Sequence, residues 1–454
     1  MIRFFFRMLC GMLLFFCGTW VSFSQVQLST HPTVIIVTLD GFPARALQDP
    51  YLPMPTLRSL IRAGAVADAM RPVNPTVTWP NHTAMVTGVD ASQHFVMANG
   101  LLTFPADDSR PNVMPWVPKA QLVHARTLYE AADEKGLTTG QVDWVAIFGA
   151  HGVTWKFGES PELNDIVTQE LIADRKISAD EILHFGKGSP AWHDEIWTDA
   201  AVDIIEKHKP NLLLLHLLQT DSLQHEYGPL TPAAYSAYAN VDDCLGRVVE
   251  AVRKAGMSDR TTFFVLSDHG FSSYTHTIHP NVELLKLGLL QEKQSRVTGK
   301  VWVKAEGGGA ELFILDPQQR AALIPKLKQT FETMEGVAHV YTNSEAQSLG
   351  LPSDEKTDQA PQLFLAAAPG YSFDDSASGE TVTTHAPQGQ HGYLNTNPEM
   401  SALFVASGAA IRSGVHLGMI SNLQITPTVA QILNLNMPEA RQPPLDILKA
   451  GNRQ

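Results

Sequence analysis

Short apolar runs alternate with amphipathic stretches along most of this chain. Four runs are almost continuously hydrophobic, and they cover residues 33–39, 212–218, 262–266 and 402–406. Such runs are typical of strands buried on both faces of a parallel sheet. The stretches between them have helical spacing and predict helices over 125–135, 195–207, 234–255 and 425–433. Alternating strands and helices indicate a layered α/β domain.

The N-terminal residues differ in composition from the rest. Arg3 and Arg7 precede an uncharged apolar run over 8–21, and Ser22-Phe23-Ser24 places small residues where a signal peptidase cleaves. The apolar run is shorter than the ~20 residues that span a bilayer. We therefore predict a cleaved signal over 1–24, rather than an uncleaved anchor or a lipoprotein signal through Cys17. Export to the periplasm or the medium follows, with no stable membrane span after cleavage.

Charge and cysteine content narrow the classes of function. The 454 residues include 33 Lys plus Arg and 46 Asp plus Glu, which gives a net charge of −13. Such a chain has no overall basic field for duplex nucleic acid or anionic lipid, so any phosphate group must be bound at a local site. Cleavage after residue 24 leaves one cysteine, Cys244, which excludes an internal disulfide and predicts a buried, inert thiol.

Three of the apolar runs lead into aspartates. Asp40 directly follows the first run, Asp221 follows the second, and Asp268 comes after the third with His269 beside it. The carboxyl ends of parallel strands meet at one edge of a sheet, where open α/β folds bind their ligands. Clustered carboxylates repel one another unless a cation neutralises them. The pattern therefore predicts a metal site at this edge.

Two further histidines fit the same site. His225 lies four residues after Asp221, and His391 stands in a glycine-flanked loop, Gly389-Gln390-His391-Gly392. Carboxylate and imidazole ligands without thiolate suit zinc in a hydrolytic site, although manganese or another divalent metal remains an alternative. The other histidines are interpreted as surface or packing residues. His216, alone within an apolar strand, is interpreted as a core residue rather than a ligand.

A threonine completes the candidate chemistry. Thr78 precedes Trp79-Pro80-Asn81-His82, and because proline is favoured in the first turn of a helix, Thr78 is predicted at a helix N-terminus. That position favours an anion. Alone, Thr78 would be an ordinary N-cap. Beside a metal ion, its hydroxyl could ionise and act as a nucleophile.

Six separated motifs, in order from about residue 32 to about residue 435, together resemble the signature of one family. It is the type I phosphodiesterase/nucleotide pyrophosphatase family of the alkaline phosphatase superfamily. The resemblance implies an alkaline-phosphatase-like three-layer α/β sandwich with a mostly parallel central sheet. The motifs are Asp40, the segment 78–82, Asn99, Asp221 with His225, Asp268-His269-Gly270, and His391-Gly392-Tyr393.

The same resemblance implies hydrolysis of small-molecule phosphate diesters at two zinc ions. Thr78 would attack the phosphorus to give a phosphothreonine, while Asn99 and the backbone N–H after Thr78 would hold a phosphoryl oxygen. Trp79 would contact the substrate by stacking on a base or an aryl leaving group. The implied ligands are Asp221, His225 and His391 for the first ion, and Asp40, Asp268, His269 and the Thr78 oxygen for the second.

Several alternatives remain open from the sequence. Many nucleotide-cleaving members of the family carry an aromatic residue five positions before the aspartate of the Asp-x-x-x-His motif, where this chain has His216. Preference for nucleotides is therefore left open. A phosphomonoesterase with an added cation such as Lys156 or Lys187, a phosphonate hydrolase and an inactive metal-binding module are alternatives. A sulfatase is disfavoured, because it would need a Cys or Ser nucleophile followed by x-Pro-x-Arg.

The segment between His269 and His391 is too long for a simple loop. A helix is predicted over 321–334 and a strand over 362–367, and the glycine triplet at 307–309 is interpreted as a structural turn. We predict an inserted, smaller α+β cap over 275–385 at the entrance to the site. The catalytic core would then comprise 25–274 and 386–454.

Overall fold

A computed structural model of the chain describes residues 31–294 and 296–450, so the predicted signal over 1–24 lies outside the described residues. Within these ranges, no helix combines the length and the apolar character needed to cross a membrane.

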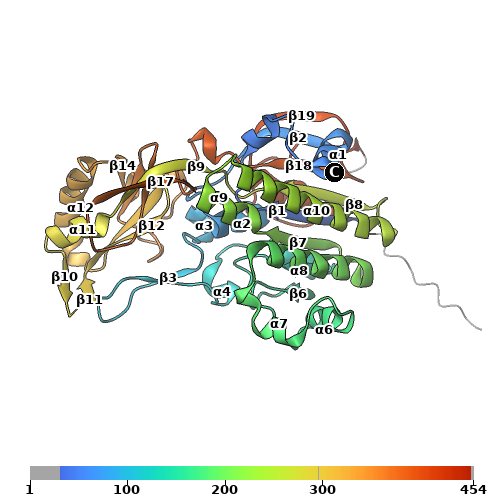
Figure 1. The fold of residues 1–454 in the computed structure, drawn as a ribbon, viewed down its shortest axis with the longest axis horizontal. Coiled ribbons are helices and arrows are strands. Elements are labelled where there is room, and N and C mark those ends of the chain that lie inside the picture. Colours follow the sequence, from blue (N-terminus) through green and yellow to red (C-terminus); the bar gives the residue numbers. More distant parts are fainter. Residues whose placement is uncertain (1–30, 295, 451–454) are drawn as a thin grey trace, which may run out of the picture. The chain divides into compact units, whose positions relative to one another are not determined.

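An eight-stranded sheet forms the centre of the fold (Figure 1), with the strand order β19-β2-β18-β8-β1-β7-β5-β6. The five strands from β8 to β6 are parallel, as are β19 and β2. The sheet is thus mostly parallel, as the sequence predicted. Its strands are β1 (Thr33–Leu39), β2 (Ala65–Arg71), β5 (Thr139–Val142), β6 (Trp155–Phe157), β7 (Leu212–Leu217), β8 (Thr261–Leu266), β18 (Phe404–Gly408) and β19 (Val415–Ser421).

Helices cover both faces of this sheet and confirm the three-layer architecture. Alternate side chains of β1 enter opposite cores: Ile35 and Val37 belong to one hydrophobic cluster, and Val34 and Ile36 belong to the other. The first cluster includes residues of α1 (Pro55–Ala63), α6 (Ile166–Ala173), α8 (Pro190–Asp203) and α10 (Pro232–Lys254). The second includes residues of α2 (Thr78–Thr87), α5 (Leu128–Glu134) and α14 (Ile425–Leu433).

The strand predicted over 402–406 is present as β18, but its direction differs from the expectation of a parallel strand. It runs antiparallel to both β8 and β2. The reason is topological. The chain leaves the main sheet after β8 and returns beside the carboxyl end of that strand, so β18 starts at the edge where its neighbour β8 ends.

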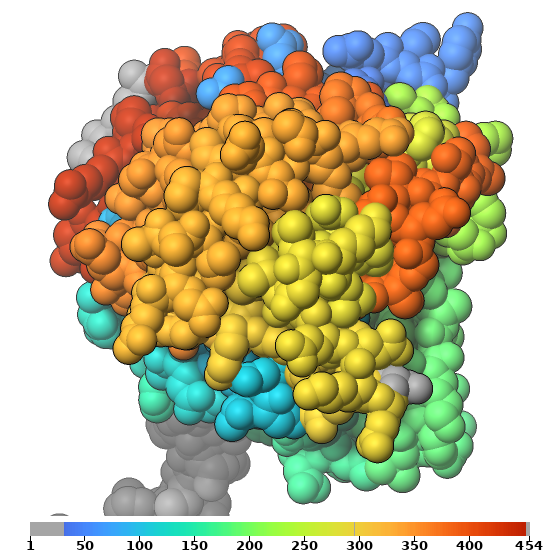
Figure 2. Space-filling view, turned by 90° about the vertical axis from the view of Figure 1, so that its left-hand side faces the viewer, coloured from blue at the N-terminus to red at the C-terminus, as the bar shows by residue number. Residues whose placement is uncertain are grey.

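The excursion between these strands builds a second sheet. Its four antiparallel strands have the order β12-β13-β15-β14. They are β12 (Val301–Glu306), β13 (Gly309–Ile314), β14 (Val337–Thr342) and β15 (Leu363–Ala367), packed on α12 (Pro317–Glu332) around a separate hydrophobic cluster. The predicted helix over 321–334 and strand over 362–367 correspond to α12 and β15. Figure 2 shows the outer surface of this segment in yellow and orange. The cap boundaries 275 and 385 remain a prediction.

Two strands lead into and out of this segment. They are β9 (Ser272–Ile278) and β17 (Val382–Gln390), which pair antiparallel, with the short β16 (Tyr371–Phe373) on the other side of β9. The remaining elements are α3 (Ala91–His94), α4 (Lys119–Leu122), α7 (Ala179–Leu183), α9 (Gln219–Tyr227), α11 (Pro280–Lys286), α13 (Asn343–Ala346), β3 (Leu101–Thr103), β4 (Asn112–Met114), β10 (Leu290–Lys293) and β11 (Arg296–Gly299).

Cys244 is buried in α10, and burial raises its pKa to about 12, as an inert thiol requires.

Candidate metal centre

The adjacent strands β8, β1 and β7 bring the predicted aspartates together. Asp40 directly follows β1, and its backbone N–H donates to the carbonyl of Leu217, the last residue of β7. Asp221 lies in the first turn of α9, just after β7, and Asp268 follows β8. The parallel register therefore places all three carboxylates at one edge of the sheet.

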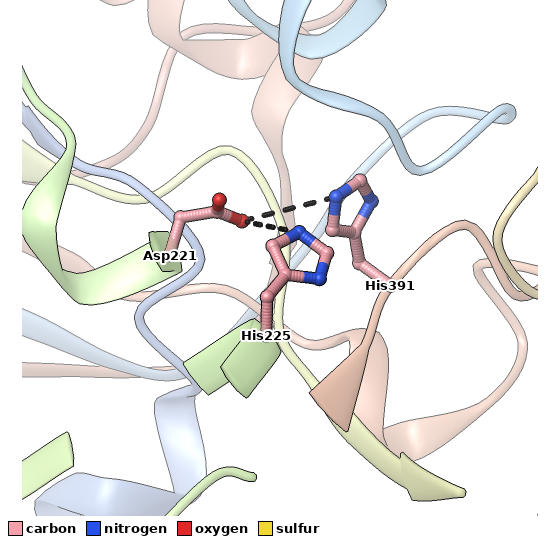
Figure 3. Close-up of side chains that lie close together, drawn as sticks. All are labelled: Asp221, His225 and His391. Carbon is pink, nitrogen blue, oxygen red and sulfur yellow. Dashed lines mark ion pairs between the residues drawn. The ribbon is translucent and has the colours of Figure 1, made fainter. Parts of the chain in front are cut away.

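The first group of side chains comprises Asp221, His225 and His391 (Figure 3). His225 Nε2 lies 3.3 Å from Asp221 Oδ1, because the two residues are one turn apart on α9. His391 follows the last residue of β17 and brings its Nε2 to 3.8 Å from the same oxygen. Nδ1 of His225 faces the Gly389 carbonyl, and Nδ1 of His391 faces the Thr76 carbonyl. Both Nε2 atoms therefore remain available to bind one metal ion.

The second group comprises Asp40, Asp268 and His269, all buried. His269 Nε2 lies 3.5 Å from Asp40 Oδ1 and 3.2 Å from Asp268 Oδ2. Thr78 Oγ1 is 3.4 Å from the same nitrogen. The second group and the candidate nucleophile thus converge on one point. The rings of His269 and His391 stack with centroids 3.9 Å apart, so the two groups adjoin.

Three buried carboxylate oxygens without hydrogen-bond partners indicate that metal ions fit this site. Asp40 Oδ1, Asp221 Oδ1 and Asp268 Oδ2 are buried and have no hydrogen-bond partner. Burial raises the pKa of Asp40 well above its usual range, and the neighbouring Asp268 and Asp221 raise it further. Unpaired buried carboxylates are strongly unfavourable, and divalent cations would satisfy all three oxygens at once. The residues present therefore fit a metal centre.

The protonation of two of the three histidines also suits metal binding. Burial lowers the pKa of His269 to about 4 and lowers the pKa of His391 well below its usual range, so both imidazoles are neutral near pH 7. Burial opposes protonation of His225, but the Asp221 carboxylate outweighs it and raises the pKa. Neutral imidazole is the form that binds zinc.

Thr78 is the first residue of α2, at the predicted helix N-terminus. The buried His82 supports this turn: its Nδ1 lies 2.9 Å from the Thr78 carbonyl and its Nε2 lies 2.9 Å from Thr38 Oγ1. The Trp79 N–H donates to Asn99 Oδ1 at 3.0 Å. The family resemblance implied that this N–H would donate a hydrogen bond to a phosphoryl oxygen. In the structure it orients the Asn99 amide, whose NH₂ group remains as the donor of the pair.

Asp143 and His216 belong to the site and were not predicted. Asp143 directly follows β5, the next strand in the sheet, so it is a fourth aspartate at the same edge. His216 Nε2 lies 3.0 Å from Asp40 Oδ2, and its Nδ1 lies 2.9 Å from Asp143 Oδ2. Burial opposes protonation of His216, but both carboxylates outweigh it and raise the pKa. His216 is thus buried, as predicted, but its partners belong to the site.

The sequence gave only a weak indication that Asp143 lies at the carboxyl edge of the sheet. It obeys the same rule as Asp40, an aspartate directly after a strand, but the preceding strand Thr139-Gly140-Gln141-Val142 is short and half polar. Such a run does not stand out as a buried strand.

Two cavities that share part of their lining lie beside the candidate metal centre. The inner cavity has a volume of about 250 Å³ and is lined by Asp40, Thr78, Asn99, Asp221, His225 and His391, among others. The outer cavity, of about 780 Å³, shares five of its lining residues: Trp79, Pro115, Trp116, Val145 and Glu159. No Lys or Arg is among the described residues that line the inner cavity. Lys156 lines the outer cavity and pairs with Asp165 at 3.2 Å, and Lys187 lines neither.

Comparison with known proteins places this site in context. The family model described as "Type I phosphodiesterase / nucleotide pyrophosphatase" matches residues 34–394. An uncharacterized pyrophosphatase/phosphodiesterase of Schizosaccharomyces pombe is 23% identical over 412 residues, which cover 89% of this chain and 77% of the relative. Human ectonucleotide pyrophosphatase/phosphodiesterase family member 1 is 23% identical over 420 residues, which cover 89% of this chain but only 40% of the human protein.

A solved structure shows the same fold. Human ectonucleotide pyrophosphatase/phosphodiesterase 5 superposes with a TM-score of 0.69 at 18% sequence identity, over 92% of this chain and 100% of the human one. At this identity the likeness concerns the fold alone, and it agrees with the alkaline-phosphatase-like sandwich that the sequence predicted.

Proposed function

Because the chain belongs to the type I phosphodiesterase/nucleotide pyrophosphatase family, whose members hydrolyse phosphodiester bonds, we propose that it cleaves small phosphate diesters with Thr78 as the nucleophile. The observation that carries this proposal is the convergence of two adjoining ligand groups beside the Thr78 hydroxyl. We assign one zinc ion to Asp221, His225 and His391. We assign a second to Asp40, Asp268, His269 and Thr78 Oγ1. The carboxylate and imidazole ligands support zinc, with other divalent metals as alternatives.

Two bound cations would supply the positive charge that a phosphoryl group needs during displacement. Thr78 Oγ1 forms a bond to phosphorus, and the bond to one alcohol group breaks on the opposite side. Water then cleaves the phosphothreonine and regenerates the hydroxyl. The Asn99 NH₂ group holds a phosphoryl oxygen, oriented by its hydrogen bond from the Trp79 N–H. The N-terminus of α2 favours the same anionic group.

The charges around the inner cavity favour a diester over a monoester. A phosphate monoester carries about −1.5 to −2 charges at pH 7, whereas a diester carries one. An added cation beside the metal ions would balance the difference. The described residues that line the inner cavity include no such cation, and Lys156 is paired in the outer cavity.

We further propose that the protein is exported to the periplasm or the medium. The sequence pattern over residues 1–24 supports export. So does the name of the human relative, an ectonucleotide pyrophosphatase.

The nucleophile is tested with Thr78→Ala and Thr78→Ser in the zinc-loaded protein. We expect Thr78→Ala to lose turnover of bis(p-nitrophenyl) phosphate, because the nucleophile is absent, and to retain zinc, because the carboxylate and imidazole ligands of both ions remain. Thr78→Ser should keep measurable turnover, because it keeps the hydroxyl. The wild-type protein should hydrolyse this diester faster than p-nitrophenyl phosphate. An active Thr78→Ala variant would exclude Thr78 as the nucleophile, and faster monoester cleavage would exclude the diesterase assignment.

A further inference from the structure

A third group of carboxylate and imidazole side chains lies at the opposite edge of the main sheet from the candidate metal centre. It comprises Glu170 of α6, Asp203 at the end of α8, and His208. One ligand atom of each residue lies within 4.8 Å of the ligand atoms of the other two. His208 comes shortly before β7, which begins at Leu212. The group therefore lies near the amino end of β7, whereas Asp221 follows the carboxyl end of the same strand.

A π-helical turn over Ile204–His208 brings two of these residues to the same side of the chain. The Lys209 N–H donates to the carbonyl of Ile204, five residues earlier, at 3.1 Å, and Lys209 has a left-handed φ of +50°. In an α-helix, residues five positions apart point about 140° away from each other. The wider π-helical turn instead lets Asp203 and His208 converge. Such turns are rare and occur frequently at functional sites.

Asp203 contributes a buried oxygen without a partner. Its side chain is 6% exposed, and its Oδ1 pairs with Lys207 Nζ at 2.5 Å. Its Oδ2 has no hydrogen-bond partner among the described residues. Burial and the adjacent Glu170 carboxylate raise the pKa of Asp203 to about 6, so at mildly alkaline pH two neighbouring acids are ionised. Neighbouring carboxylates repel each other unless a cation neutralises them.

Glu170 and His208 complete the ligand set. His208 Nε2 lies 2.8 Å from Glu170 Oε2. The imidazole stacks on the indole of Trp155 in β6, with ring centroids 4.8 Å apart and 19° between the ring planes, which restricts its orientation. The side chains of His208 and Glu170 are 18% and 26% exposed, so an ion can reach them from solvent. Two carboxylates and one imidazole are ligands typical of zinc and manganese.

We propose that Glu170, Asp203 and His208 form a third metal site, for a divalent cation such as zinc. The ion joins α6, the end of α8 and the turn before β7, so its role is structural. An ion-pair network without metal is the competing explanation. A protonated His208 would pair with Glu170, but it would leave Asp203 Oδ2 without a partner. The site is independent of the proposed function, because none of its ligands lines the inner or the outer cavity.

The test counts metal ions per chain in the zinc-loaded protein by mass spectrometry after gel filtration. His208→Phe keeps a ring to stack on Trp155 but removes the ligand nitrogen, and Glu170→Gln removes a charged ligand at nearly constant shape. His184→Phe is the matched control. His184 also faces a carboxylate, Asp180, at 3.5 Å, but it belongs to no three-ligand group among the described residues. Turnover of bis(p-nitrophenyl) phosphate is measured for each protein.

We expect His208→Phe and Glu170→Gln each to hold one ion fewer per chain than the wild type, and His184→Phe to hold the same number. Turnover should stay near the wild-type value in all three variants, because the site lies outside both cavities. Equal metal content in the wild type and both ligand variants overturns the inference and leaves the ion-pair network. Loss of an ion together with turnover assigns that ion to the candidate metal centre and also overturns it. If the wild type holds only the ion that His208→Phe loses and cleaves no diester, the third site is supported while the proposed function fails.

Discussion

Gly392→Ala tests whether the inserted segment positions His391, a proposed metal ligand. Gly392 has a φ of +83°, and a Cβ at this position would lie 1.7 Å from the carbonyl oxygen of Glu306, the last residue of β12. The neighbouring Gly308 N–H donates to the His391 carbonyl at 2.8 Å. The turn after β12 and the His391 loop are therefore in direct backbone contact.

The magnitude follows from this contact. A carbon atom approaches a carbonyl oxygen to about 3.3 Å, so the loop and the turn must separate by about 1.6 Å. Metal ligands tolerate displacements of about 0.2 Å. A misplacement of about 1 Å in a catalytic arrangement costs about 100-fold in rate. We therefore expect Gly392→Ala to lower kcat/KM for bis(p-nitrophenyl) phosphate about 100-fold and to lose the ion assigned to His391.

Gly370→Ala is the matched control. Gly370 has the same φ of +83°, but an added Cβ meets no atom within 4 Å. This variant carries the cost of a left-handed residue, about 1 to 2 kcal/mol of stability, without the clash. It should retain both ions and wild-type kcat/KM. Metal content is measured by mass spectrometry after gel filtration. If Gly392→Ala also retains both ions and its activity, the inserted segment does not hold His391 in place.

Three further results are expected. His216→Gln should weaken metal binding at the group containing Asp40 by about 10- to 100-fold, because the imidazole orients that carboxylate; competition with a chelator measures this, and unchanged affinity would contradict it. Asp268→Asn should lose the second ion while retaining the first, as seen in metal content. Removal of metal by a chelator should lower the Tm, because an ion present at 100 times its Kd contributes about 2.7 kcal/mol; an unchanged Tm would argue against bound ions.

The sequence determined the central layers and most of the candidate site. Strands buried on both faces need continuous apolar residues, which made β1, β7 and β8 recognisable. An aspartate one or two residues after the end of such a strand lies at the carboxyl edge of the sheet. The positions of Asp40 and Asp268 therefore followed from local pattern alone. The roles of Thr78, Asn99 and the seven metal ligands remain predictions from the family resemblance.

Other features were decided only by the tertiary structure. The polar strand β5 joins the sheet by pairing with β7, and this pairing brings Asp143 close to His216. The paired residues are 73 positions apart in the chain. The glycine triplet was predicted as a turn, but the need for Gly308 comes from the Tyr393 ring packed against it. The direction of β18 and the shared lining of the two cavities likewise depend on which distant segments meet. The local periodicity of the sequence indicates whether a residue is buried. Packing between segments that are remote in the chain determines which residue it contacts.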